Sequence, residues 1–188
     1  VGNNDVPVEP HSMVFVGYYR HTPNVDAVQY FCREILPLIQ KQSPQAKLYV
    51  VGAEPSREVL SLHDGESIIV TGRVEDLRPY IARAAVFVVP LRLGAGLRGK
   101  VIEAWAMKKA VVSTSVGCLG LDAQHGFNAL IADRADEFAG HVLGLFQDRR
   151  MAARLGENGF KTVSAEHDVP VQVRKHEQLY FELFKSAF

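Results

Sequence analysis

AVFVVPLRLGAGLRGKVIEAWAMKKAVVST, residues 85–114, combines two apolar runs with a glycine-rich turn and a helical pattern between them. The first run, 85–90, contains no polar residue, which is typical of a strand buried on both faces of a parallel sheet. The turn at 93–99 leads into a helix that reaches about Lys109, and a second strand follows at 110–114. This segment therefore predicts a strand, helix and strand unit with parallel pairing.

The same alternation continues on both sides of this unit. Thr22 and Pro23 predict a helix N-cap and the first helical residue after it. Right-handed crossovers then give an α/β fold, a doubly wound parallel sheet with helices on both faces, whose ligands bind at the carboxyl ends of the strands. Further strands are expected at 13–17, 47–51, 67–71 and 129–131, and further helices at 22–39, 56–63, 75–83 and, in about three segments, from 133 to the end.

Composition narrows the classes of function. A chain of 188 residues fits one domain or one lobe of a larger protein. Lys and Arg total 21, as do Asp and Glu, so no overall charge favours nucleic acid, and no apolar run approaches the ~20 residues of a membrane span. Cys32, Cys118 and the seven histidines lack the spacings of metal ligands. We therefore expect no nucleic acid partner, no membrane span and no metal.

The beginning of the chain predicts its domain organisation. Residues 1–12 are rich in Asn, Pro and Asp without periodicity, which is typical of a linker, and 13–188 are expected to form one domain. The chain opens on Val1 and lacks the features of a signal peptide. This pattern favours an excised domain whose upstream partner is missing.

The glycine-rich segment at 94–103 predicts an anion site, because the free N–H groups of a helix start attract phosphate. A dinucleotide fingerprint would need an acidic residue after the next strand, which instead ends in 113–115, Ser-Thr-Ser. A P-loop would need a hydroxyl at Val101. Lys100 and Glu103 fit a third pattern, in which the lysine neutralises a diphosphate and the carboxylate accepts hydrogen bonds from a ribose diol.

Several spaced segments resemble group 1 (family 4) glycosyltransferases of the GT-B fold, over about residues 13–147. They are 23–27, 72–74, 90–96, 100–104, 110–114, 126–130 and 133–138. The resemblance implies the C-terminal, Rossmann-like domain of a two-domain enzyme. Its substrate would be a nucleotide-diphosphate sugar, linked to UDP or GDP, with no other cofactor.

The resemblance also implies a reaction and a place in the cell. The sugar would move with retention of configuration and without a metal, as in a hexosyltransferase, to an acceptor held by an N-terminal domain absent here, so this fragment would be inactive alone. The protein would be cytoplasmic, and a place at the inner membrane face stays open for the full-length enzyme. No catalytic residue is assigned.

The family's donor site maps onto ten positions of this sequence. They are Glu103 for the ribose, Lys100 and the backbone of Gly94, Ala95, Gly96 and Leu97 for the diphosphate, Arg73 and Val74 for the base, and Gly17 and Arg20 in the loop after the first strand. Two positions depart from the family's pattern. Ala95 replaces the first glutamate of the Glu-x7-Glu motif, and Arg20 is the one candidate for a phosphate partner in its loop.

Simpler interpretations of the same residues stay open. Lys100 and Glu103 could form a surface pair, and Arg73 and Arg98 are as compatible with solvent as with ligand. Trp105 is expected in the core. Two other functions also fit: half of a GT-B sugar-nucleotide epimerase, or a non-catalytic nucleotide-binding or scaffold domain.

Overall fold

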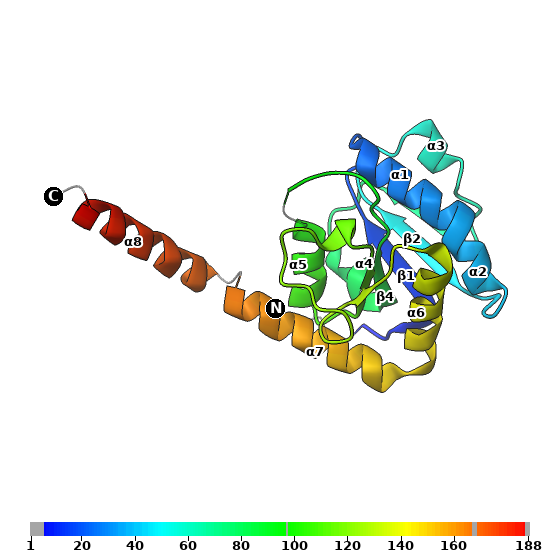
Figure 1. Ribbon diagram of the computed structural model, residues 1–188. Coiled ribbons are helices and arrows are strands. Elements are labelled where there is room, and N and C mark those ends of the chain that lie inside the picture. Colours follow the sequence, from blue (N-terminus) through cyan, green and yellow to red (C-terminus); the bar gives the residue numbers. More distant parts are fainter. Residues whose placement is uncertain (1–5, 97, 167–168, 187–188) are drawn as a thin grey trace.

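The computed structural model describes residues 6–96, 98–166 and 169–186, and these contain one six-stranded sheet in the order β3-β2-β1-β4-β5-β6 (Figure 1). Each pair of neighbouring strands runs parallel. The winding reverses between β1 and β4, so the predicted doubly wound, Rossmann-like α/β fold is confirmed. The strands are β1 (Glu9–Val16), β2 (Lys47–Val51), β3 (Ile68–Gly72), β4 (Ala84–Val89), β5 (Val111–Ser113) and β6 (Leu130–Ile131).

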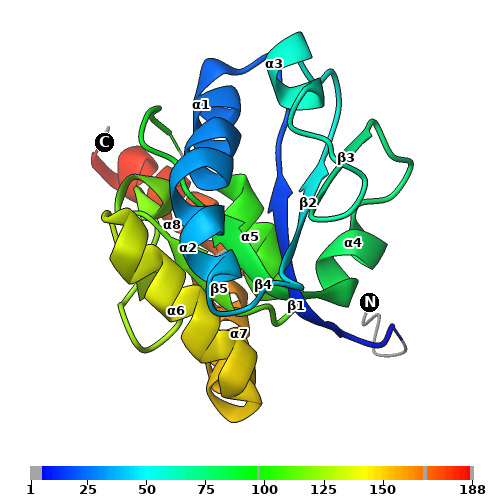
Figure 2. The same cartoon turned by 90° about the vertical axis from the view of Figure 1, so that its right-hand side faces the viewer.

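Helices connect these strands and cover both faces of the sheet. They are α1 (Thr22–Tyr30), the π-helical η1 (Phe31–Ile35), α2 (Leu36–Gln40), α3 (Arg57–Leu60), α4 (Arg78–Arg83), α5 (Gly99–Ala106), the 3₁₀ turn η2 (Val116–Cys118), α6 (Ala135–Gln147), α7 (Arg149–Glu166) and α8 (Val169–Ser186). Helices α1, α2 and α6 lie on one face, and α5 packs against α7 on the other (Figure 2). Helix α8 projects from the rest of the molecule (Figure 1). Within the described residues, no helix is both long and apolar enough to cross a bilayer.

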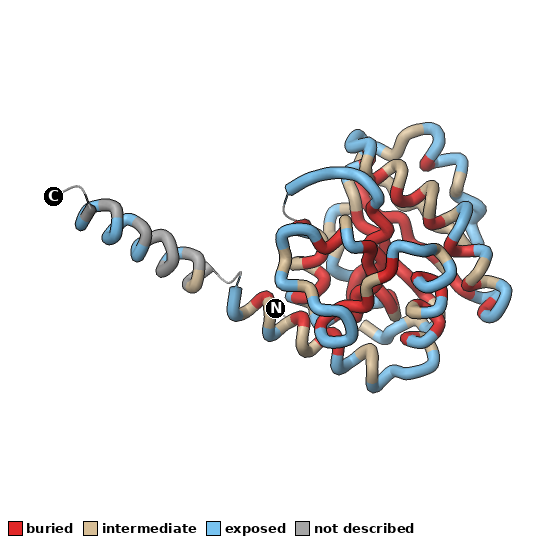
Figure 3. The backbone as a smooth tube through the Cα atoms, viewed as in Figure 1, coloured by how far each residue is buried: buried red, intermediate tan, exposed pale blue. Residues whose placement is uncertain are grey.

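The core lies between these layers, and β2, β4 and β5 are its most buried strands, whereas β3 at the edge of the sheet is only partly buried; Figure 3 shows the buried segments gathered in the middle of the domain. Five of the six residues of β4 are buried, as expected for a central strand. Trp105 of α5 is fully buried, so its predicted core position is confirmed, and its indole N–H donates to the carbonyl of Asn128 at 2.9 Å. The helix that opens at the glycine segment is thereby fixed to the core by its largest side chain.

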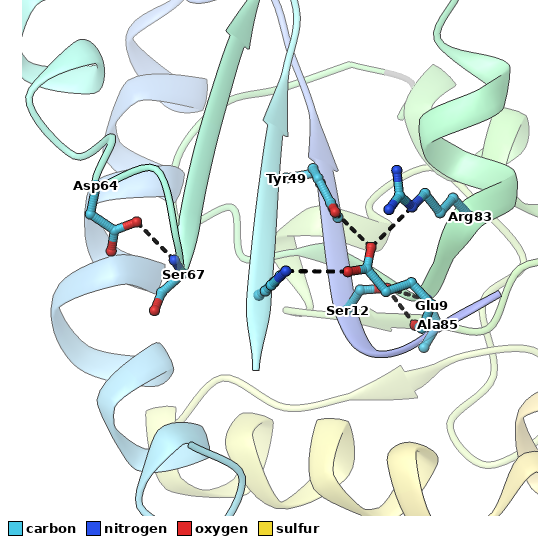
Figure 4. Close-up of polar contacts among 8 residues, drawn as sticks. Glu9, Ser12, Tyr49, Asp64, Ser67, Arg83 and Ala85 are labelled. Atoms are coloured by element: carbon cyan, nitrogen blue, oxygen red, sulfur yellow. Dashed lines mark hydrogen bonds and ion pairs between the residues drawn. The ribbon is translucent and has the colours of Figure 1, made fainter. Parts of the chain in front are cut away.

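Strand β1 begins at Glu9, four residues before the expected start, so residues 9–12 are strand and the prediction of a linker there was wrong. Its pairing with β4 shifts register between Glu9 and Met13, and His11 has a φ of 58°. Ser12 bridges this irregular region, because its hydroxyl donates to the carbonyl of Glu9 and accepts from the amide of Ala85 (Figure 4). Side-chain contacts, rather than apolar alternation, hold the start of this strand.

Glu9 anchors the amino ends of the strands (Figure 4). Its carboxylate accepts from the Tyr49 hydroxyl at 2.6 Å and lies 3.1 Å from Nε of Arg83 and 3.5 Å from Nζ of Lys47. Desolvation alone would raise the pKa of Glu9, but the Tyr49 hydrogen bond and the charges of Arg83 and Lys47 together lower it. This polar cluster lies at the opposite end of the strands from the site described below.

Two helix starts differ from the predicted ones. The N-cap of α1 is His21, without a side-chain cap, so Thr22 is the first helical residue and Pro23 the second. Helix α4 begins at Arg78 rather than near residue 75, because Asp76 accepts hydrogen bonds from the amide and guanidinium of Arg78 and forms a turn ahead of the helix.

Candidate functional site

A pocket of about 560 Å³ lies beside the carboxyl end of β4, between the start of α1 and the glycine segment. It occupies the point where the winding of the sheet reverses, because β1 precedes α1 and β4 precedes the glycine segment. Four residues predicted to bind the donor line it together: Arg20, Gly94, Ala95 and Lys100.

Gly94 and Gly96 shape the edge of this pocket. Their φ angles are 106° and 88°, values that favour glycine. A Cβ on Gly94 would also lie 3.3 Å from Nη1 of Arg98 and 3.4 Å from Cγ of Pro23, so the packing there is tight and the positive φ disfavours a side chain. Gly96 and Ala95 are exposed, and their amides donate to no acceptor in the described part of the chain. The predicted contact through Leu97 lies outside the described residues.

Arg98 lines the same pocket and holds the glycine segment through its carbonyl groups. Only 8% of the residue is exposed, and its guanidinium donates to the carbonyls of Gly94 at 2.8 Å, Ala95 at 3.3 Å and Val116 at 3.0 Å. The sequence left Arg98 equally compatible with solvent and with ligand. In the structure Arg98 instead donates its hydrogen bonds to main-chain carbonyls. No sequence pattern predicts this for a single arginine in a loop.

Lys100 lies in the first turn of α5 with its ammonium in the pocket wall. Its Nζ donates to Oδ1 of Asn24 at 2.6 Å and lies 4.2 Å from the centroid of the Phe15 ring. Burial, followed by the nearby charge of Arg98, lowers the pKa of Lys100 to about 7. Neither the Lys100 ammonium nor the Arg98 guanidinium forms an ion pair with a carboxylate among the described residues. The proposed surface pair of Lys100 with Glu103 is not formed.

Asn24 is a site residue that the sequence did not predict. It is 8% exposed, and its Nδ2 donates to the carbonyl of Tyr18 at 2.9 Å while its Oδ1 receives the Lys100 ammonium. Gly17 makes room for it, because a Cβ on Gly17 would lie 3.0 Å from Cγ of Asn24. Gly17 thus acts behind the pocket rather than in its wall. The sequence feature that could have indicated this role is a polar residue in the first turn of α1, directly after the loop that follows β1.

Glu103 lies one turn further along α5, outside the lining of this pocket. It is half-buried, and its carboxylate makes no hydrogen bond or ion pair in the described part of the chain. Burial, followed by the charge of Asp76, raises the pKa of Glu103. A partly buried carboxylate without donors is a strong acceptor for hydroxyl groups.

The remaining predicted residues belong to loops other than the glycine segment. Arg20 reaches the pocket, but it is largely exposed and forms an ion pair with Glu54. Arg73 is exposed in the loop after β3, and Val74 packs against the core. The charge of Asp76, in the same loop, contributes to the raised pKa of Glu103.

Comparison with known sequences identifies the family. A sequence model of the group 1 glycosyl transferases matches residues 10–148, which is most of the chain. One curated relative, an uncharacterized 44.6 kDa protein in the cps region of Klebsiella pneumoniae, is 26% identical over 165 residues. The alignment covers 84% of this chain and 42% of that relative, so the chain spans less than half of its length.

Solved structures share the fold. The C-terminal domain of the group 1 glycosyl transferase LpcC from Francisella tularensis has a TM-score of 0.68 and 17% identity, covering 89% of this chain and 90% of that one. Sucrose-phosphate synthase from Thermosynechococcus elongatus has a TM-score of 0.73 and 25% identity, covering 97% and 47%. The Anabaena protein HepE in complex with UDP and glucose has a TM-score of 0.73 and 16% identity, covering 91% and 48%.

The family match covers the β-sheet except for Glu9, the first residue of β1, and continues through α6. The similar structure of LpcC is itself an isolated C-terminal domain of nearly the same extent. The chain belongs to the group 1 glycosyl transferases and has the fold of their C-terminal, GT-B domain.

Proposed function

We propose that this chain is the donor-binding half of a glycosyltransferase and that the pocket at the start of α5 binds the diphosphate of a nucleotide sugar. The observation that carries this proposal is the Lys100 ammonium, which is largely buried in the pocket wall and forms no ion pair with a carboxylate of the described residues. A buried cation of this kind is unfavourable until an anion approaches. The helix start beside it adds further attraction for phosphate.

The rest of the donor would extend along α5. Glu103 would accept hydrogen bonds from the ribose hydroxyls, and the loop with Arg73 and Val74 would contact the base. The effect of the Asp76 charge on the pKa of Glu103 is consistent with this order. UDP is the first nucleotide to test, because HepE, which has a similar fold, was solved with UDP and glucose.

The reaction would be sugar transfer with retention of configuration to an acceptor bound by a separate N-terminal domain. Negative charge grows on the diphosphate as the bond to the sugar breaks. Lys100 and the amides of Ala95 and Gly96 would stabilise that charge without a metal. The chain covers only 42% of its curated relative, which supports a second domain in the complete protein.

Ala95 favours a second candidate, a domain that binds the nucleotide without transferring the sugar. It is exposed at the pocket edge, where the family's pattern has a glutamate. Joining this chain to the upstream part of its protein would separate the two candidates. Transfer is expected for the first and nucleotide binding alone for the second.

Calorimetric titration with UDP, GDP and ADP tests the binding site directly. We expect weak binding of one of the three and no turnover by this chain alone, because half of the cleft would be missing. Uridine serves as the control ligand without phosphate and should bind much more weakly. An absence of heat with all three nucleotides at about millimolar concentration would reject the proposal.

A further inference from the structure

Arg98 occupies a position that charge attraction alone does not explain. Its guanidinium is buried, yet each of its hydrogen bonds goes to a main-chain carbonyl, and it pairs with no carboxylate in the described part of the chain. Two of these carbonyls, those of Gly94 and Ala95, belong to the exposed edge of the pocket. The third, that of Val116, belongs to η2, behind the sheet's carboxyl end. Arg98 therefore joins the glycine segment to a buried part of the fold.

The direction of the two edge carbonyls determines the direction of the next two amides. In a trans peptide the C=O of one residue and the N–H of the next point in opposite directions. With the carbonyls of Gly94 and Ala95 turned toward the guanidinium, the N–H groups of Ala95 and Gly96 point away from it. These two N–H groups have no acceptor among the described residues. Arg98 thereby makes the exposed side of the segment a surface of hydrogen-bond donors.

Gly94 leaves room for the guanidinium of Arg98 beside the main chain. A Cβ there would lie 3.3 Å from Nη1 of Arg98, and the φ of 106° disfavours any side chain. Gly94 and Arg98 thus act together to orient this segment. Arg98 also lies close enough to lower the pKa of Lys100, so the two positive charges act on the same region.

We propose that Arg98 is a positioning residue, which aims the amides of Ala95 and Gly96 at the diphosphate of the donor while its own hydrogen bonds stay with the protein. This inference rests on the proposed function. It assigns to Arg98 a role through the main chain, distinct from the direct contact proposed for Lys100.

Two variants of the 188-residue chain distinguish the effect of the hydrogen-bond geometry of Arg98 from the effect of its charge. Arg98→Gln removes the charge and the fork of donors, whereas Arg98→Lys keeps the charge but cannot bridge three carbonyls. We expect both to lower UDP affinity by about tenfold or more and to leave the weak binding of uridine unchanged. Full UDP affinity in Arg98→Lys would overturn the positioning role, because charge alone would then suffice.

A second measurement needs no variant. In the wild-type chain, UDP should move the amide proton resonances of Ala95 and Gly96 downfield, as expected when an N–H group begins to donate to an anionic oxygen. If UDP binds and these two resonances do not move, the inference about Arg98 fails while the proposed function stands. If UDP does not bind the wild-type chain at all, the proposed function itself fails.

Discussion

Lys100 illustrates how a residue can oppose folding and support binding. The folded protein lowers its pKa from 10.5 to about 7, so the charged form is disfavoured relative to the unfolded chain. Below about pH 7 the folded protein carries this cost in full, and the cost decreases as the pH rises toward the unfolded pKa. A bound phosphate would favour the charged form again. Binding of a diphosphate above pH 7 should therefore take up a proton.

The first prediction follows from this proton uptake on binding. UDP affinity should fall as the pH rises from about 7 to 9, by up to about tenfold per unit, although UDP itself is fully ionised in this range. Titration calorimetry in two buffers with different ionisation enthalpies would measure both the affinity and the proton uptake. Lys100→Met is the control, and it should bind UDP weakly without pH dependence while gaining about 1–2 kcal/mol of stability. A pH-independent affinity in the wild-type chain contradicts this account.

Glu103 gives the second prediction. Glu103→Gln keeps the size of the side chain but weakens its acceptor strength, so UDP affinity should fall by about 1–2 kcal/mol. The pKa of Glu103 is raised, which means that its ionised form is disfavoured in the folded protein, and its removal should not lower the melting temperature. Titration with 2′-deoxy-UDP supplies the comparison. If the variant and the wild type lose equal affinity on removal of the 2′-hydroxyl, Glu103 does not bind the ribose.

At the scale of the elements, two glycines of α7 bring it into contact with α5, the helix that carries Lys100 and Glu103. A Cβ on Gly159 would lie 2.2 Å from Cδ1 of Trp105, and a Cβ on Gly156 would lie 2.0 Å from the carbonyl oxygen of Lys108. Helix α7 can therefore pack this closely only where it lacks side chains. The position of the proposed donor site depends in part on a helix that does not line it.

The third prediction concerns this contact. Gly159→Ala should destabilise the protein by about 1–3 kcal/mol, because the added methyl would overlap the Trp105 ring. The matched control is Gly140→Ala in α6, where a Cβ would meet nothing within 4 Å and the higher helix propensity of alanine should add up to about 1 kcal/mol of stability. Urea denaturation of both variants measures the difference. Equal stabilities would show that α7 moves away from Trp105 at little cost.

Local patterns predicted the central elements well. The apolar run Lys47–Val51 became β2 with the same bounds, and the run at 85–90 became β4 within one residue at each end. The early start of β1 could not be predicted in this way, because Ser12 holds it through contacts with Ala85, far away in the sequence. The extra strand residues are mostly polar and carry no alternation.

The same distinction applies to the site. Its location followed from the glycine segment and the carboxyl ends of the strands, which are visible in a single sequence, whereas the reversal of the winding between β1 and β4 became visible only in the structure. The partners of Lys100 and Arg98 were not visible, because Asn24 lies 76 residues from Lys100 and Arg98 contacts main-chain atoms. Every residue has a main-chain carbonyl, so the residue type does not reveal which carbonyl accepts a hydrogen bond. Pairings of this kind become predictable only when the fold is known.

At the scale of the whole molecule, α8 stands apart from the core. The core residues among those described extend no further than Val163. In α8, Tyr180, Phe181 and Phe184 are 62–69% exposed, more than is usual for aromatic side chains. We therefore expect the fold of residues 9–166 to form without this helix.

The fourth prediction is that a chain ending at Glu166 folds with a melting temperature within about 2 °C of the full chain. The truncated chain should also associate less with itself, because it lacks the exposed aromatic side chains of α8. Differential scanning calorimetry and size-exclusion chromatography measure the two effects. A drop of more than about 5 °C would mean that α8 stabilises the core.

The common direction of all six strands has a practical consequence. Their amino ends form one rim of the molecule and their carboxyl ends, with the pocket, form the other. Gln45 is exposed in the short connection that precedes β2 and so belongs to the first rim. A protein immobilised through a cysteine introduced at this position would present the rim that carries the pocket to bulk solution. A surface-based sensor could then measure ligands of any size without obstruction by the support.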